Sequence, residues 1–385
     1  MINFFCITKE SMIKDICDFV DIEYNETESA ILYELFLSVQ NGKQSTKDIL
    51  EQVDWKFIKD NNKKLIITHR IVYHLKFFKE AILDYIKRYD CKDNVIWYSF
   101  NPYEANDKDI NVAFFDPINH VNFEMDLLAK ERNEKVGGIC KFKKITDFAF
   151  KTFEKSDKYF ISTNKRHASY RVLSNHLLNK KDLIKKGYYS FYPKQNERYD
   201  DEIEKEWLDY FSENKKVLEK NNTTIEQIQE DVSKNYILDP EAIKGLWLQL
   251  ESIEYFYEKS LVAHVTESIA NDSEMYITEK TYIPILMGRP FLVIGNKHLL
   301  RFLKNYYGFK TFDKIFDESY DDETCEITKT IKVTEELDKF CSLPFSKARE
   351  KVESVKHILE HNRKICNNMD RAFLFKKTLT KIIEG

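Results

Sequence analysis

The sequence predicts an α/β protein with two domains, each built around a parallel sheet. Short apolar runs bounded by glycine, proline or polar residues alternate with helical stretches, a pattern typical of parallel βαβ units. A chain of 385 residues is long for one hydrophobic core. Its 43% hydrophobic and 14% aromatic content is ample for two ordinary cores.

The N-terminal domain is expected to end at residue 155. Helical spacing in SAILYELFLSVQ and TKDILEQVDWKFI predicts helices within the first 60 residues. A further helix is predicted in VYHLKFFKEAILDYIKRY. Three short apolar runs predict strands, at residues 65–68, 95–100 and 112–115. Strands that alternate with helices indicate a parallel sheet.

The second domain is expected over residues 156–344. We predict a strand at 159–163, a helix at 169–179, charged helical scaffold over 196–258, a helix closed by Gly308 with a strand beyond it, and a solvated acidic loop at 317–323. Residues 345–385 are expected to form one or two long helices.

The clearest βαβ unit lies at residues 261–295. It reads as a strand at 261–266, a helix that opens at Thr278 and a strand at 291–294. Thr278 can cap the helix, and the free N–H groups behind it would favour an anion. The sequence therefore predicts an anion site at the start of this helix.

Charged residues surround that helix start. Lys280 adds a positive charge, while Glu267 and Glu279 place two carboxylates where open α/β sheets bind ligands, with Ser268 beside Glu267. Donors for phosphates and carboxylates for hydroxyls suit a sugar nucleotide. The competing interpretation is an ordinary capped surface helix.

A basic turn follows the strand at 159–163. It contains Asn164, Lys165 and Arg166, and Arg171 follows in the next helix. Guanidinium groups match phosphate bidentately, so this turn could hold a diphosphate. The competing interpretation is a basic surface turn.

The composition excludes several classes of function. A net charge of −4 gives no overall basic field to attract nucleic acid, and a glycine-rich dinucleotide fingerprint is absent. Seven cysteines without a CxxC pair indicate neither a disulfide framework nor a zinc site. Without a signal peptide or an apolar run of roughly 18 residues, we expect a cytoplasmic protein with no membrane contact.

The segment VTES…YITEKTYIPILMGRPFLVIG resembles the donor-binding motif of the alpha-1,3-fucosyltransferase family. The basic turn is similar to an S-N-x-x-x-x-x-R segment of that family, with Asn164 and Arg171 at the matching positions. The resemblance covers roughly residues 158–320. It implies the GT-B fold, in which two Rossmann-like domains face a cleft braced by the C-terminal helices, and the use of GDP-fucose without a metal.

The resemblance also implies residue roles. Glu279 would bind the ribose or sugar of the donor, Lys280 its diphosphate, and Glu267 would contact the donor sugar. In contrast to the family pattern, Thr281-Tyr282 replace an aliphatic–aromatic pair, and Pro284 is expected to interrupt the helix. A looser likeness, through NKRHASYR…LLNKKDLIKKGYYSF and GFKTFDKIFDESYD, is to phage and large-virus glycosyltransferase-like proteins.

An inverting transfer also needs a general base for the acceptor hydroxyl. Asp116, after the apolar run INVAFF, is the predicted base, with Glu104 and His120 as further candidates. The competing interpretation makes Asp116-Pro117 a simple turn. The predicted catalytic residues are therefore Asp116 and Glu267. The predicted donor-binding residues are Asn164, Lys165, Arg166, Arg171, Ser268, Thr278, Glu279 and Lys280.

Together these features predict a metal-independent, inverting glycosyltransferase that uses a GDP- or UDP-linked sugar and needs no cofactor. The acceptor would be a glycan or a modified nucleobase. Two alternatives remain open: a viral enzyme that glycosylates DNA bases, and a non-catalytic module that binds a nucleotide or glycan.

Overall fold

The structure is a computed structural model of the whole chain. It describes residues 2–7, 11–19, 23–30, 32–37, 46–69, 75–99, 104, 107–114, 149–164, 167–191, 197–234, 236, 238, 250–268, 270, 275, 277–369 and 377–378. The chain divides into two compact units. Unit 1 comprises residues 1–128 and 369–385, and unit 2 comprises residues 129–368. The sequence-based limits at 155 and 344 stay predictions.

Unit 1 contains a parallel six-stranded sheet in the order β2-β1-β3-β4-β5-β6. Its strands are β1 Ile2–Cys6, β2 Tyr24–Glu26, β3 Leu32–Leu37, β4 Lys64–His69, β5 Val95–Ser99 and β6 Asn111–Phe114. The order reverses between β1 and β3, as in doubly wound α/β folds.

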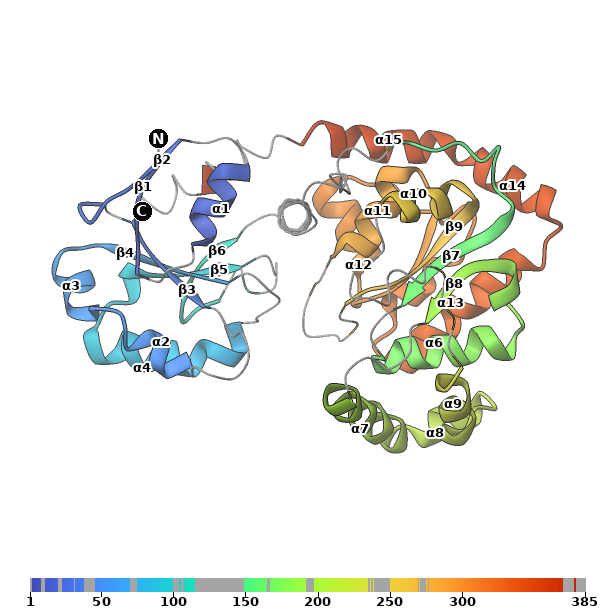
Figure 1. Cartoon of the computed structure of the whole chain (residues 1–385), viewed down its shortest axis with the longest axis horizontal. Coiled ribbons are helices and arrows are strands. Elements are labelled where there is room, and N and C mark those ends of the chain that lie inside the picture. The colour runs from blue at the N-terminus through green and yellow to red at the C-terminus, as the bar shows by residue number, and fades with distance from the viewer. Residues whose placement is uncertain are drawn as a thin grey trace. The chain divides into compact units, whose positions relative to one another are not determined.

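Helices cover both faces of this sheet (Figure 1). Their bounds are α1 Met12–Phe19, α2 Thr46–Leu50, α3 Trp55–Asp60 and α4 Leu75–Tyr89. Apolar residues of α2, α3 and α4 pack with those of β3, β4 and β5 around buried Trp55 and Trp97. α1 lies on the opposite face (Figure 1).

Unit 2 contains a parallel four-stranded sheet in the order β10-β9-β7-β8. Its strands are β7 Lys158–Asn164, β8 Gly187–Phe191, β9 Ser260–Thr266 and β10 Phe291–Ile294. Every residue of β9 and β10 is buried, as expected for parallel strands covered on both faces. Here the order reverses between β7 and β9.

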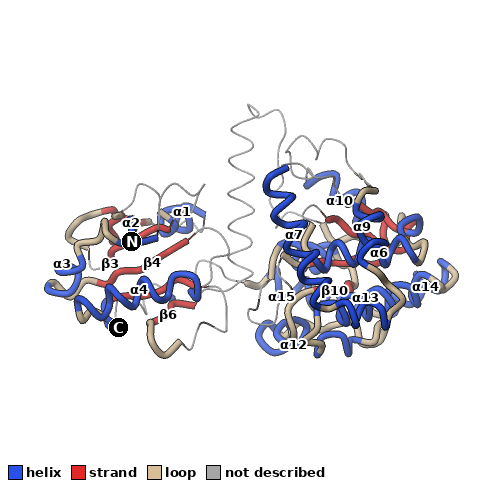
Figure 2. Tube along the Cα trace, turned by 90° about the horizontal axis from the view of Figure 1, so that it is seen from below, coloured by secondary structure: helices blue, strands red, loops and turns tan. Residues whose placement is uncertain are grey.

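Helices also flank the sheet of unit 2. α6 and α13 pack together on one face, and α10, α11 and α15 lie on the other (Figure 1). The helix bounds are α6 Ser169–Lys180, α7 Glu197–Glu213, α8 Lys215–Lys220, α9 Ile225–Val232, α10 Leu250–Glu258, α11 Glu279–Met287, α12 Leu299–Phe302, α13 Glu326–Cys341, α14 Phe345–Ser354 and α15 Lys356–Asn367. Figure 2 shows the strands of each sheet side by side between helices.

Four expectations for local structure are wrong. The middle of SAILYELFLSVQ forms β3 and not the expected helix. Leu32, Tyr33 and Leu35 are all buried in this central strand, so its apolar residues do not alternate regularly with polar ones. Residues 309–312 form no strand, and residues 318–322 form a 3-10 helix instead of a solvated loop. α11 continues through Pro284.

Other expectations are confirmed. The predicted strands coincide with β4, β5, β6, β7, β9 and β10 within one or two residues, and Thr278 is the N-cap of α11. Gly308 closes the helix that begins at Leu299, with the positive φ of 75° that glycine adopts at little cost. Among the described residues, no helix is long and apolar enough to cross a membrane.

Candidate functional site

The candidate site lies at the carboxyl ends of β7 and β9 in unit 2. The strand order reverses between these two strands, and such a reversal is where open α/β sheets bind ligands. Asn164 ends β7 and Thr266 ends β9. The Thr266 hydroxyl donates to the Asn164 amide oxygen at 2.5 Å, so the two strand ends are joined directly.

Glu267 follows β9 and caps α11 from within the fold. Its fully buried carboxylate accepts hydrogen bonds from the Ser268 N–H (3.1 Å), the Thr278 N–H (3.1 Å), the Thr278 hydroxyl (2.6 Å) and the Thr281 hydroxyl (2.5 Å). The Thr278 hydroxyl in turn accepts from the Lys280 N–H. The N–H groups of Thr278 and Lys280 therefore have acceptors within the chain. The anion site at the start of this helix stays a prediction.

Ser268, Glu279 and Lys280 form a half-buried polar cluster beside this cap. The Lys280 ammonium donates to the Glu279 carboxylate at 2.6 Å and to the Ser268 hydroxyl at 3.1 Å. Burial raises the pKa of the Glu279 carboxyl, but the charge and hydrogen bond of Lys280, with the charge of Arg171, outweigh it and hold that pKa below its ordinary value. Glu279 is therefore ionised at neutral pH.

Arg171, on the first turn of α6, brings a second cation to the same strand end. It is only 3% exposed, and its Nη2 donates to the main-chain oxygens of Glu267 (2.6 Å) and Thr266 (3.2 Å). Within the described residues, its Nε is buried without a hydrogen-bond partner. Among the described residues no carboxylate pairs with Arg171. A buried guanidinium with unused donors is poised for an anion.

The start of α6 supports this interpretation. Its N-cap, Ala168, provides no side-chain hydrogen bond, in contrast to the capped start of α11. The dipole of a helix favours an anion at its start. Tyr170, which sequence reasoning missed, donates its hydroxyl to the Glu267 main-chain oxygen at 2.6 Å and lies beneath the Arg171 guanidinium. An aromatic residue next to Arg171 was the available signal.

The corresponding point of unit 1 is filled by a carboxyl group of the chain itself. Glu34 on β3 is fully buried, and its carboxylate accepts from the N–H groups of Met12 (2.9 Å) and Ile13 (3.1 Å) at the start of α1. The hydroxyls of Ser11 and Thr68 complete its shell. Burial raises the pKa of Glu34 despite these bonds. An internal carboxylate thus occupies the place that an external anion would take.

The structure brings one group of the predicted site residues together in unit 2: Asn164, Arg171, Glu267, Ser268, Thr278, Glu279 and Lys280. Glu104 lies after β5 in unit 1, where its carboxylate accepts from the Ser99 hydroxyl (2.6 Å) and the Trp97 indole (3.1 Å). Asp116, His120, Lys165 and Arg166 lie outside the described residues, so their roles stay predictions.

No metal centre is found in the part of the chain that the structure describes, where no group of three or more His, Cys, Asp or Glu side chains is arranged to hold an ion. Comparison of the chain with protein-family models, with curated proteins and with solved structures finds no match. The function must therefore be argued from the site itself.

Proposed function

We propose that this chain is a glycosyltransferase that moves a sugar from a nucleotide diphosphate sugar to an acceptor hydroxyl. One observation carries the proposal: two cations, Arg171 and Lys280, meet at the carboxyl ends of β7 and β9. Arg171 contacts the main chain of Glu267, and Lys280 contacts the side chain of the next residue, Ser268. Parallel α/β sheets bind nucleotides at this kind of strand end.

The two cations suit a diphosphate. The Nε of Arg171 has no hydrogen-bond partner in the described part of the chain, and planar donors of this kind match phosphate oxygens. The Lys280 ammonium has three N–H donors and hydrogen-bonds to Ser268 and Glu279, so its third donor can bind a phosphate oxygen. Ser268 and the ionised Glu279 are left to bind hydroxyls of the ribose or sugar. The resemblance to the fucosyltransferase donor motif supports a sugar as the transferred group.

In the proposed reaction the acceptor oxygen forms a bond to the anomeric carbon while the bond from that carbon to the diphosphate oxygen breaks. The acceptor proton passes to a base, for which Asp116 stays the prediction, and the nucleoside diphosphate leaves. Arg171 and Lys280 would stabilise the charge that develops on it, the task that a metal performs in other transferases. Glu267 holds α11 in place, and its contact with the donor sugar stays a prediction.

The test is turnover of GDP- and UDP-linked sugars with glycan acceptors, in the presence of a chelator, followed by mass spectrometry of the product. Replacement Lys280→Ala is expected to lower kcat by about 10²–10³-fold, because it removes a cation from the developing charge. Lys347→Ala is the matched control. Lys347 makes an exposed pair with Glu350 on α14, and that helix contacts the amino end of β7 through Arg349 and Ser156.

Other outcomes would point to different functions. Nucleotide binding without turnover of any acceptor would favour a non-catalytic binding module. Binding to duplex DNA that weakens steeply with salt would favour an enzyme that glycosylates DNA bases. Full activity of Lys280→Ala would contradict the proposed role of this site.

A further inference from the structure

α6 carries a polar face that is buried over its first turns and partly buried at Asn179. Arg171, Asn175 and Asn179 follow one another at intervals of four residues, so they share one side of the helix. Arg171 and Asn175 are buried. The first turn of this face contacts the end of β9 through Arg171, whereas its later turns contact α9.

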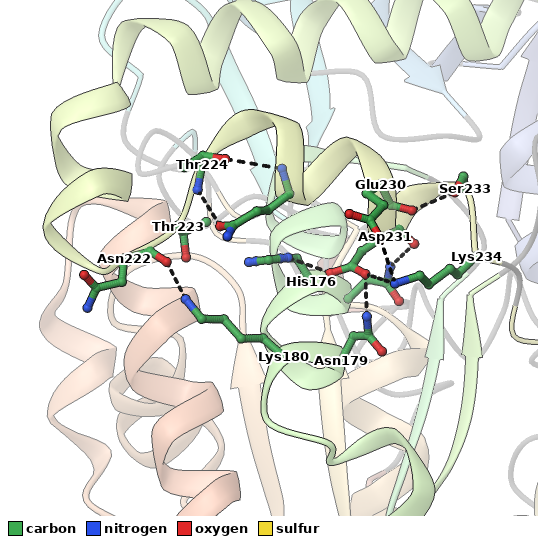
Figure 3. A network of polar contacts seen from close by, with 12 residues as sticks. His176, Asn179, Lys180, Asn222, Thr223, Thr224, Glu230, Asp231, Ser233 and Lys234 are labelled. Atoms are coloured by element: carbon green, nitrogen blue, oxygen red, sulfur yellow. Dashed lines mark hydrogen bonds and ion pairs between the residues drawn. The ribbon is translucent and has the colours of Figure 1, made fainter.

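The contact with α9 converges on a single residue, Asp231 (Figure 3). Its carboxylate accepts from the His176 ring at 2.7 Å, from the Asn179 amide and from the Lys234 ammonium at 2.6 Å. Its main-chain oxygen accepts from the Asn175 amide at 3.0 Å. In the described part of the chain, every hydrogen bond between α9 and α6 ends on Asp231.

The network leaves little freedom to α6. Asp231 is only 6% exposed, and its bonds with His176 and Asn175 are buried away from water. The Tyr189 hydroxyl donates a hydrogen bond to the amide oxygen of Asn175, and the Tyr236 hydroxyl donates one to the amide oxygen of Asn179. Burial lowers the pKa of His176 although Asp231 opposes the shift, so the ring is neutral at pH 7. Lys234 then supplies the positive charge opposite Asp231.

Arg171 depends on this support. Among the described residues its guanidinium donates to the main-chain oxygens of Thr266 and Glu267 and lies over the Tyr170 ring, and no carboxylate there pairs with it. Its position therefore follows that of the helix that carries it. The segment α7–α9 lies in the sequence between β8 and α10. One crossover helix is enough to connect two parallel strands, so α7–α9 is an inserted helical segment. Its last helix, α9, packs against α6 (Figures 1 and 3).

We propose that Asp231 is a positioning residue for the diphosphate site. By clamping two turns of α6 to α9, it fixes the rotation and axial position of the helix, and so holds the Arg171 guanidinium at the ends of β7 and β9. The inserted helical segment thereby sets the affinity for the nucleotide diphosphate. This inference rests on the proposed function.

The test is the dissociation constant of GDP and of UDP, measured by calorimetry well below the melting temperature of each variant. Asp231→Asn keeps the size of the side chain. It replaces one carboxylate oxygen, which accepts from His176 or Asn179, with an NH2 group that can only donate. It is expected to weaken binding about tenfold, the usual scale for coupled neighbouring residues. Glu230→Gln is the matched control, since Glu230 lies on the same helix with its side chain 76% exposed.

A double-mutant cycle separates positioning from a general loss of structure. In an Arg171→Lys background, Asp231→Asn is expected to cause little further weakening, because the group that it positions is gone. In a Lys280→Ala background the tenfold effect is expected in full. An effect of equal size in both backgrounds would overturn the inference. If Asp231→Asn does not fold, Asn179→Ala replaces it with the same expected and contradicting results.

The proposed function and this inference fail in different ways. A wild type that binds neither nucleotide overturns both. Wild-type binding that Asp231→Asn leaves unchanged overturns the inference alone.

Discussion

His264 shows how one buried residue links the stability of unit 2 to pH. It lies in the middle of β9, 2% exposed, with its Nδ1 3.0 Å from the Ser162 hydroxyl. Burial lowers the pKa of His264 from 6.5 to about 4. The unfolded chain then binds more protons between these two pH values, so the free energy of unfolding falls as pH drops below 6.5.

We therefore expect a loss of stability on the order of 2 kcal/mol between pH 7 and pH 5 from this residue. Denaturant unfolding at both pH values, on the wild type and on His264→Gln, measures it. The variant should lose most of that pH dependence, whereas His357→Gln, at an exposed position of α15, should keep it. Equal pH dependence in the wild type and His264→Gln would contradict the assignment.

Residue types at the candidate site could be predicted, but their contacts could not. The pattern of Glu267, Thr278 and Lys280 indicated a charged strand end and a capped helix. It did not reveal that the Glu267 carboxylate fills the helix start, because that contact joins residues eleven positions apart through a turn. Nor did it show that Arg171 is buried with no carboxylate paired to it among the described residues, which depends on how α6 packs.

At the scale of elements, Arg289 connects the ends of two helices with the segment that precedes β7. Its guanidinium is fully buried and donates to the main-chain oxygens of Tyr257 (2.8 Å), Lys151 (2.7 Å), Thr152 (2.9 Å) and Gly288 (3.0 Å). It thereby ties the ends of α10 and α11 to the segment before β7. Arg289 therefore has a structural role at the amino end of β10, the opposite end of the sheet from the candidate site.

Replacement Arg289→Lys is expected to lower the free energy of unfolding by about 3 kcal/mol, because an ammonium cannot satisfy these buried oxygens in the same plane. Arg301→Lys, which alters an exposed pair with Asp322, should cost less than about 1 kcal/mol. Urea unfolding of both variants compares them. Similar losses in the two variants would contradict the role given to Arg289.

Elements with a simple pattern were predicted well from the sequence. The fully buried strands β9 and β10, with helix α11 between them, read clearly as a βαβ unit. The first strands of unit 1 did not. β1 and β2 carry no turn signal that separates them from a helix, and β3 combines buried apolar residues with the buried Glu34. A charged residue in a central strand hides the strand pattern.

At the scale of the whole molecule, the two units share the same kind of parallel sheet but differ in the side chains at the point where the strand order reverses. Each sheet is parallel and reverses its order beside its first strand. In unit 1 the Glu34 carboxyl fills that point without a cation beside it among the described residues, whereas in unit 2 Arg171 and Lys280 lie there beside the carboxylates of Glu267 and Glu279. This asymmetry is why we place the nucleotide diphosphate in unit 2.

The most direct test of that claim is a thermal-shift panel of GDP, UDP, ADP, CMP and dTDP on the wild type, Lys280→Ala and Lys347→Ala. A ligand at a hundredfold excess over its dissociation constant adds about 2.7 kcal/mol to the free energy of unfolding. We expect one nucleoside diphosphate to raise the melting temperature of the wild type and of Lys347→Ala by several degrees, and to lose that effect in Lys280→Ala. No shift with any nucleotide, or an undiminished shift in Lys280→Ala, would contradict the account.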